Sequence, residues 1–195
     1  MKKYFKNQLG QTLLEMIFAM GILMMVVAAV LALSAASIAG EKESESQVTA
    51  NNLAREGIEV VRNIRDTNWL LKVDWDMGMK PEPSLLKCQP VFNSGSGTWL
   101  VSFPTSQIDS NFLVYLSTTG IYNYDTTGTP TGFYRYLLLN YICQKSDGSE
   151  YAKTDSTNCL NNETKIGLKV QSNVSWQESG KARSVNIEDY LYAWK

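Results

Sequence analysis

Two pairs of closely spaced carboxylates are the residues of this 195-residue chain whose types could support acid–base chemistry. Asp74 and Asp76 flank a tryptophan, and Asp147 and Glu150 flank a Gly-Ser step. General acid–base catalysis requires carboxyl groups that face each other across a cleft and have pKa values pushed apart by their surroundings. Acids this close together in irregular segments usually form turns and face water, and we interpret both pairs in that way.

The chain contains no histidine. This removes the commonest general base, the commonest metal ligand and every arrangement in which histidine activates serine or cysteine. Asp125, Asp147 and Asp155 could offer oxygen ligands to calcium, but they lack the spacing of an EF-hand loop. A glycine-rich phosphate-binding loop is also missing. We therefore expect no enzyme, no catalytic residue, no cofactor and no metal site.

Basic residues recur between positions 55 and 72, where Arg55, Arg62, Arg65 and Lys72 could form a stripe that contacts DNA. Acidic residues are interleaved with them, at positions 56, 59 and 66. A helix with mixed charges is more often a solvated face or a subunit-contact face than a nucleic-acid site. We prefer that interpretation and keep DNA binding as an alternative.

The three cysteines, Cys88, Cys143 and Cys159, include no CxxC pair. Without histidine, a zinc site would need four thiolates or help from carboxylates. In an exported domain a disulfide is the natural interpretation. We predict Cys143–Cys159, because Cys143 ends an apolar strand and Cys159 follows a polar loop that the bridge would tether. Pairing of Cys88 with either partner is the alternative.

An apolar run begins at Met16, and no charged residue occurs from Met16 to Gly40. A transmembrane helix needs about 20 residues at about 1.5 Å each, so this run can span a membrane. Lysines precede it at positions 2, 3 and 6, which favours a cytoplasmic N-terminus and an extracytoplasmic C-terminal domain. A signal peptide cleaved near residues 34–36 and a plain uncleaved anchor are the alternatives.

A carboxylate, Glu15, stands five residues after Gly10 at the start of this run, in the sequence Gly-Gln-Thr-Leu-Leu-Glu. An acid near a helix N-terminus complements the helix dipole. However, a charged side chain at mid-membrane costs about 2.5–3.5 kcal/mol, so an intramembrane acid usually has a function. A lysine-rich leader, a glycine, Thr-Leu-Leu-Glu and an apolar run together resemble the prepilin cleavage and methylation signal of type IV pilins and pseudopilins.

The resemblance implies specific roles for three residues. A membrane prepilin peptidase/methyltransferase would cut after Gly10 and methylate the new N-terminal residue, Gln11, while Glu15 would be the carboxylate used in assembly. The family usually has Phe or Met where Gln11 stands. Many major pilins also carry a proline within the apolar segment, and this chain has none between Gly10 and Gly40. Both departures favour a minor pilin or a pseudopilin.

The function implied by the resemblance is that of a structural subunit, of the minor type, of a type IV pilus or a related pseudopilus. Before assembly it would be a single-pass protein of the cytoplasmic membrane. Inner-membrane assembly machinery and other pilin subunits would be its partners, and the cell-surface filament its destination. The alternative is a membrane-anchored extracytoplasmic binding or adhesion domain that does not polymerise.

A helical pattern continues beyond the apolar run. Glu59 and Asp66 are spaced for ion pairs with Arg62, and the first stop signals lie at residues 66–68. We therefore expect one helix from about residue 11 to residue 66, about 80 Å long. Its second half carries apolar residues with a period of 3.6: Val48, Leu53, Gly57, Val60, Val61 and Ile64.

The remaining residues show a β pattern. Alternation over 166–176 and 185–193, around a Ser-Gly turn, predicts a hairpin. Residues 133–143 are apolar on both faces, which indicates a central strand. Residues 99–103 and 112–116 make a plausible further pair. Residues 72–97 contain three prolines and a Gly-Ser-Gly tract, and we expect them to be irregular.

The order of elements, a long helix and then an antiparallel sheet, predicts an α+β, pilin-like fold. We divide the chain into a leader at 1–10, a transmembrane and filament-core helix at 11–40, a helix continuation packed on the head at 41–68, and a β-rich extracytoplasmic head at 69–195. Tyr190, Tyr192 and Trp194 share one face of the last strand. We expect them to pack in the core, with an exposed adhesive patch as the alternative.

Overall fold

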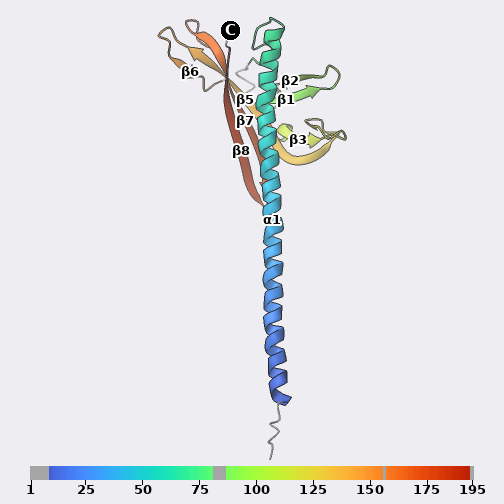
Figure 1. The fold of residues 1–195 in the computed structure, drawn as a ribbon. Helices are drawn as coiled ribbons and strands as arrows, with labels where there is room; N and C mark the ends of the chain where they lie inside the picture. Colours follow the sequence, from blue (N-terminus) through green and yellow to red (C-terminus); the bar gives the residue numbers. More distant parts are fainter. Residues whose placement is uncertain (1–8, 81–86, 156, 194–195) are drawn as a thin grey trace, which may run out of the picture. The chain divides into compact units, whose positions relative to one another are not determined.

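The structure is a computed structural model that describes residues 9–80, 87–155 and 157–193, with side chains from residue 12. The chain forms two compact units, 1–46 and 47–195. One helix, α1 (Leu9–Leu70), runs through the first unit and opens the second (Figure 1). Within the described residues it is followed by the short helix η1 (Asp109–Phe112) and by the strands β1 (Lys87–Asn93), β2 (Thr98–Ser102), β3 (Leu113–Leu116), β4 (Tyr122–Asn123), β5 (Thr129–Gln144), β6 (Glu150–Ala152), β7 (Thr164–Glu178) and β8 (Lys181–Tyr192).

All strand pairs are antiparallel, so the predicted α+β class is confirmed. The sheet is organised around β5, which pairs with β7 along one edge. The other edge of β5 is shared by β3, β1 and β6 in turn. The prediction of a central strand at 133–143 is therefore confirmed. Of the predicted leader, residues 1–8 lie outside the described part of the chain.

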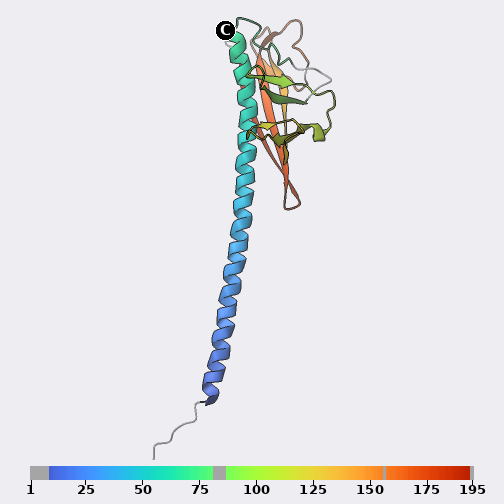
Figure 2. The same ribbon diagram turned by 90° about the vertical axis from the view of Figure 1, so that its right-hand side faces the viewer.

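The predicted C-terminal hairpin is also present, as β7 and β8, which lie side by side in Figures 1 and 2. Its two-residue turn places Ser179 at φ 49° and Gly180 at φ 75°. Two successive left-handed residues match the turn type that fits the twist of antiparallel strands.

Two predictions in the region between the helix and β5 are wrong. Residues 87–93, expected to be irregular, form β1, and Pro90 lies inside it opposite Val101 of β2. The Gly-Ser-Gly tract is the turn of this β1–β2 hairpin, closed by a hydrogen bond from Gly97 N to Asn93 O of 2.8 Å. Consequently β2 pairs with β1 and not with the strand at 113–116, which pairs with β4 and β5.

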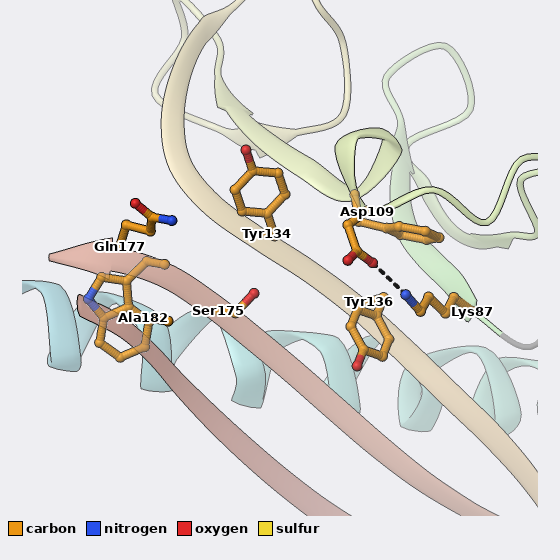
Figure 3. A pocket seen from close by; sticks show the side chains of 9 residues that line it. Lys87, Asp109, Tyr134, Tyr136, Ser175, Gln177 and Ala182 are labelled. Atoms are coloured by element: carbon orange, nitrogen blue, oxygen red, sulfur yellow. Dashed lines mark hydrogen bonds and ion pairs between the residues drawn. The ribbon is translucent and has the colours of Figure 1, made fainter. Parts of the chain in front are cut away.

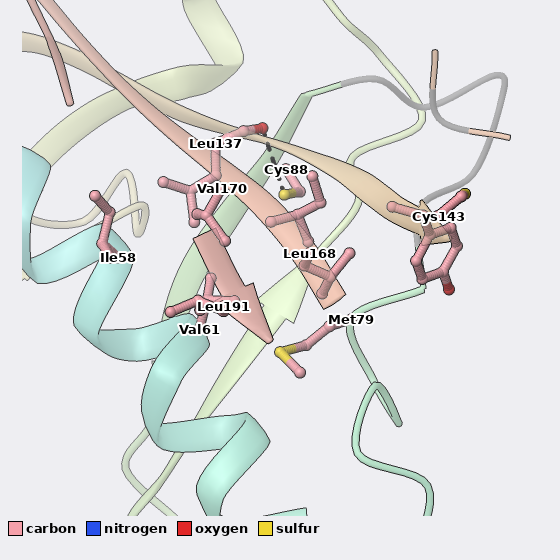
Figure 4. Packing of buried hydrophobic residues seen from close by; sticks show 11 residues of the cluster. Ile58, Val61, Met79, Cys88, Leu137, Cys143, Leu168, Val170 and Leu191 are labelled. Atoms are coloured by element: carbon pink, nitrogen blue, oxygen red, sulfur yellow. Dashed lines mark hydrogen bonds between the residues drawn. The ribbon is translucent and has the colours of Figure 1, made fainter. Parts of the chain in front are cut away.

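The core of the second unit lies between one face of the sheet and residues 50–61 of α1. Figure 4 shows the cluster, with Ile58 and Val61 of the helix facing Leu137 of β5, Val170 of β7 and Leu191 of β8. Gly57 makes this close contact possible. A Cβ atom at Gly57 would lie 2.7 Å from a methyl of Leu137 and 2.8 Å from the Ser172 hydroxyl.

The opposite face of the sheet is open. On β8, Leu191 is buried, so the residues next to it point away from the core. Tyr190 and Tyr192 are accordingly 44% and 39% exposed, and the expectation that they pack in the core is wrong. Trp194 lies outside the described residues.

The helix ends at Leu70, slightly beyond the predicted stop at residues 66–68. The end has the hydrogen bonds of a Schellman motif, from Lys72 N to Trp69 O and from Val73 N to Asn68 O. Lys72 has φ 57°, at the position where glycine is preferred. The Asn68 side chain donates to the carbonyls of Trp75 and Met77, which fixes the chain that leaves the helix.

Candidate functional site

Gly10 and Gln11, the residues matched to cleavage and methylation, lie in the first turn of α1, which begins at Leu9. Glu15 follows on the same helix with its side chain exposed. Residues four apart lie on one face of a helix. An amine created at Gln11 would therefore stand on the same side of the helix as the Glu15 carboxylate. Within the described residues Glu15 makes no ion pair.

The apolar run after Glu15 buries none of its large side chains within the described structure. Met25 and Leu33 are both 74% exposed, and Val27 is the least exposed of the large apolar residues there, at 48%. A Cβ atom at Gly21 or Gly40 would meet no atom within 4 Å, so neither glycine serves close packing inside the chain. By length and composition, α1 can cross a membrane. Such a surface suits lipid tails or the apolar helices of other subunits.

The disulfide in the second unit joins Cys143 and Cys159, whose Cα atoms are 5.7 Å apart, which is the pair expected from the sequence. Cys88 is a buried thiol that donates to the carbonyl of Leu137. Burial raises the pKa of Cys88 above its usual value, so this cysteine stays protonated. The Glu163 carboxylate lies beside the two bridged sulfurs. Because both sulfurs are bonded to each other, they offer no thiolate to a metal.

The two acids near the end of α1 have different surroundings. Asp74 is exposed, as expected, but Asp76 is only 1% exposed, so the expectation that it faces water is wrong. Its carboxylate accepts hydrogen bonds from Tyr141 Oη at 2.8 Å and from Lys165 Nζ at 2.5 Å. Burial by itself would raise the pKa of Asp76, but the bonds from Lys165 and Tyr141 outweigh it and lower that pKa. This cluster locks the segment after the helix onto β5 and β7.

A second buried charge, Arg135 on β5, holds the helix to the sheet. The Arg135 side chain is fully buried and donates to the carbonyl of Leu53 at 3.2 Å and to Tyr124 Oη at 2.9 Å. Its guanidinium also lies 3.3 Å from the Glu56 carboxylate. A buried role for Arg135 was not predicted from the sequence. The available signal was its position two residues before Leu137, on the core-facing side of an apolar strand.

In the predicted basic stripe, Arg62 and Arg65 make their contacts inside the second unit. Arg62 bonds Glu59 and also reaches Asp189 of β8 at 2.6 Å, whereas its predicted partner Asp66 pairs with Arg65. Arg65 is buried and donates to the carbonyl of Tyr192. Two of the four residues of the stripe thus bind the helix to β8.

Three of the remaining acids, Asp125, Asp147 and Asp155, accept local hydrogen bonds from residues two positions later. Asp147 accepts hydrogen bonds from Ser149, and Glu150 begins β6. Asp125 and Asp155 accept bonds from Thr127 and Thr157 respectively. In residues 12–80, 87–155 and 157–193, Asp125, Asp147 and Asp155 do not form a group with ligand atoms close enough for one metal ion.

The N-terminal segment of the chain matches a known family model. Residues 5–38 match the family model described as the prokaryotic N-terminal methylation motif, and this range contains Gly10, Gln11 and Glu15. No curated protein and no solved structure matches the chain. The motif implies processing by a prepilin peptidase and association with other pilins, and with the exposed apolar helix it indicates a membrane-anchored protein. The chain therefore carries the type IV pilin and pseudopilin signal at the start of an α+β, pilin-like fold.

Proposed function

We propose that the protein is a minor structural subunit of a type IV pilus or a related pseudopilus. In this proposal, a prepilin peptidase cuts between Gly10 and Gln11 at the cytoplasmic face and methylates Gln11. Inner-membrane machinery then moves the anchored subunit into a filament, where its apolar helix packs against those of other subunits. The match of residues 5–38 to the methylation motif is the observation that carries this proposal.

The structure supports the proposal through the helix that follows the motif. Its side chains are exposed from Leu13 to Ile38, so this surface needs an apolar host that the chain itself does not provide. The proposal assigns the chain no catalytic role: it is the substrate of the peptidase. The main alternative remains an anchored extracytoplasmic binding or adhesion domain that never polymerises.

Processing is tested by the mass of the N-terminal peptide of protein from envelope material. We expect the wild-type chain to begin at Gln11, and Gly10→Val to leave the precursor intact, because a β-branched side chain crowds the cut bond. Gly21→Val is the matched control, since a side chain there meets no atom within 4 Å. A wild-type chain that begins at Met1 in a host with the peptidase, or one cut near residues 34–36, would contradict the proposal.

Assembly is tested by replacing Glu15. A charged amine at Gln11 and the Glu15 carboxylate are both costly in an apolar core unless each finds a partner. Pairing between neighbouring subunits would satisfy both charges and would disfavour other axial offsets. Glu15→Ala should leave membrane insertion and cleavage intact but sharply reduce incorporation into filaments, and Glu15→Asp should be intermediate.

The readout is the ratio of subunit in sheared filaments to subunit in membranes. Glu45→Ala, which removes an exposed carboxylate from the same helix beyond the apolar run, is the control. If Glu15 only complements the helix dipole, worth about 0.3–1 kcal/mol, both Glu15 variants will be incorporated normally. That result would remove Glu15 from the assembly mechanism.

A further inference from the structure

A hollow of about 410 Å³ lies on the open face of the sheet, where β5, β7 and β8 meet β1 and η1. Figure 3 shows Tyr134 and Tyr136 rising from β5, Ser175 and Gln177 on β7, and the Lys87–Asp109 pair beside them. The volume falls within the range of small-molecule sites, about 300–1,000 Å³. All its lining residues belong to the second unit, so the hollow does not depend on the N-terminal helix.

Aromatic rings form much of its wall. Tyr134 and Tyr136 are half-buried, and Phe112 is buried beside Tyr136. Trp176 lines the hollow as well, but it is buried in a core cluster with Leu53 of the helix. Phe112 packs edge-on against Tyr136, with ring centroids 5.8 Å apart, and Lys87 Nζ lies 4.7 Å from the centroid of the Tyr136 ring. These contacts hold Tyr136 in place from behind and from one side. A fixed aromatic surface is a low-entropy platform for an apolar ligand face.

Polar groups surround these rings. Within the described part of the chain, the hydroxyls of Tyr134, Tyr136 and Ser175 make no hydrogen bond. Lys87 Nζ and Asp109 Oδ1 form an ion pair of 2.5 Å, and the Asp109 side chain is otherwise exposed. The hollow therefore offers several hydroxyls and one carboxylate, but its two formal charges compensate each other.

We propose that this hollow binds a neutral carbohydrate, with a pyranose ring stacked on Tyr134. A pyranose has a face of C–H groups that packs on an aromatic ring, and a rim of hydroxyls that both donate and accept hydrogen bonds. Asp109, Ser175 and Tyr136 supply the matching partners at the edges of the site. The proposal assigns the second unit a glycan-binding role that does not depend on filament assembly.

Other ligand classes fit the same groups less well. A phosphate or another anion would meet a lysine already neutralised by Asp109, so it would gain little from Lys87. A purely apolar ligand would strip water from the Asp109 carboxylate and the Ser175 hydroxyl without replacing their hydrogen bonds, which is unfavourable. A neutral ligand with many hydroxyls has neither disadvantage.

The test uses the full chain in a detergent without a sugar headgroup, because a glycoside detergent would compete for the site. Cellobiose, lactose, maltose and N,N′-diacetylchitobiose serve as probes at millimolar concentration. Binding is followed by saturation-transfer-difference NMR and by the intrinsic tryptophan fluorescence of the chain, to which Trp176 contributes from the lining of the hollow together with four other tryptophans. We expect at least one disaccharide to bind, with competition from an excess of the same sugar and none from inorganic phosphate.

Four variants locate the site. Tyr134→Ala should weaken binding at least tenfold, whereas Tyr134→Phe, which keeps the ring, should stay within about threefold of the wild type. Asp109→Asn changes an exposed side chain without changing its shape and should also weaken binding. Tyr190→Ala removes an exposed tyrosine that does not line the hollow and should have no effect.

Three results would overturn the inference: no binding of any of the four disaccharides, binding that survives Tyr134→Ala unchanged, or displacement of the sugar by phosphate. Circular dichroism of each variant separates a loss of binding from a loss of folding, and Asp109→Asn remains informative if Tyr134→Ala does not fold. Failure here leaves the processing of Gly10 and the role of Glu15 unaffected, because those tests read cleavage and assembly.

Discussion

The cluster of Asp76, Tyr141 and Lys165 allows a quantitative test of what holds the second unit together. The Asp76 side chain is 2% exposed and that of Lys165 is 32% exposed, so the two charges are buried unequally. Removing Lys165 would leave a buried carboxylate with only the Tyr141 hydroxyl as a partner. Removing the charge of Asp76 would leave an ammonium that can still reach water. Replacing Lys165 and replacing Asp76 should therefore lower the free energy of unfolding by different amounts.

Breaking a buried ion pair by deleting one partner costs about 3–5 kcal/mol. We expect Lys165→Met to cost about 3 kcal/mol, at the lower end, because the pair is open to solvent on the lysine side. Asp76→Asn keeps an oxygen for Tyr141 and loses the ionic part of the bond to Lys165, for which we expect about 1–2 kcal/mol. In the Asp76→Asn background, Lys165→Met should cost less than about 1 kcal/mol, because no buried charge remains.

The assay is urea unfolding of the four proteins of this double-mutant cycle, followed by near-ultraviolet circular dichroism with the disulfide intact. The expected coupling is about 2 kcal/mol. For mutations at independent sites, the changes in unfolding free energy add to within about 0.3–0.5 kcal/mol. Additivity within that range, or a cost below about 1 kcal/mol for Lys165→Met alone, would refute the buried ion pair.

The pH dependence of the cluster has a definite sign. The folded pKa of Asp76 is lowered from 3.8, so the ionised carboxylate is the form that stabilises the fold. Its contribution is fully present above that unfolded pKa and is lost as the pH falls through the lower folded pKa. The difference in unfolding free energy between wild type and Asp76→Asn should thus be constant near neutral pH and shrink below about pH 4.

Two further predictions concern the backbone of α1 in the second unit and of the turn that follows it. Gly57→Ala should destabilise the protein by about 1–3 kcal/mol through overpacking, because its Cβ would lie 2.8 Å from the Ser172 hydroxyl; a thermal melt checks this, and an unchanged midpoint would mean that the helix can move away from the sheet. Lys72→Gly should stabilise it by up to about 1 kcal/mol, because Lys72 has φ 57° at the end of the helix, where a side chain is disfavoured. A lower melting temperature for Lys72→Gly, measured beside the exposed control Lys80→Gly, would contradict that reasoning.

The elements that could be predicted from the sequence are those with a local periodic signal. The hairpin of β7 and β8 shows strict alternation around a Ser-Gly turn, and β5 is apolar on both faces because it lies at the centre of the sheet. The N-terminal signal was equally accessible, since its residues are contiguous and their order and spacing define it.

The elements that were missed depend on partners distant in the sequence. Proline is disfavoured inside strands, but β5 pairs only with Lys87 and Cys88 of β1, so at Pro90 the strand is paired on one side alone, with β2. The buried Asp76 carboxylate is paired with Lys165, which is 89 positions away in the sequence, so no residue near Asp76 indicates that it is buried. Tyr134 and Tyr136 alternate on one strand, a pattern that could have indicated a shared aromatic surface, but the Lys87–Asp109 pair that completes the hollow comes from other elements.

If the protein assembles into a filament as proposed, the apolar part of α1 gives a physical reason why a polar residue would decide assembly. Fully burying one large apolar side chain is worth about 1.5–3 kcal/mol, so the exposed side chains from Leu13 to Ile38 correspond to a burial energy on the order of tens of kcal/mol. Lipid provides almost all of it, because lipid tails are as apolar as the helices of other subunits. In the proposed assembly, moving the helix from membrane to filament would therefore gain little from hydrophobicity, and the preference for the filament would have to come from packing, from contacts between heads, or from polar pairing. Glu15 is the one charged side chain between Gly10 and Glu41, so the proposed pair with a neighbouring subunit's amine would be the contact in this segment that lipid cannot imitate.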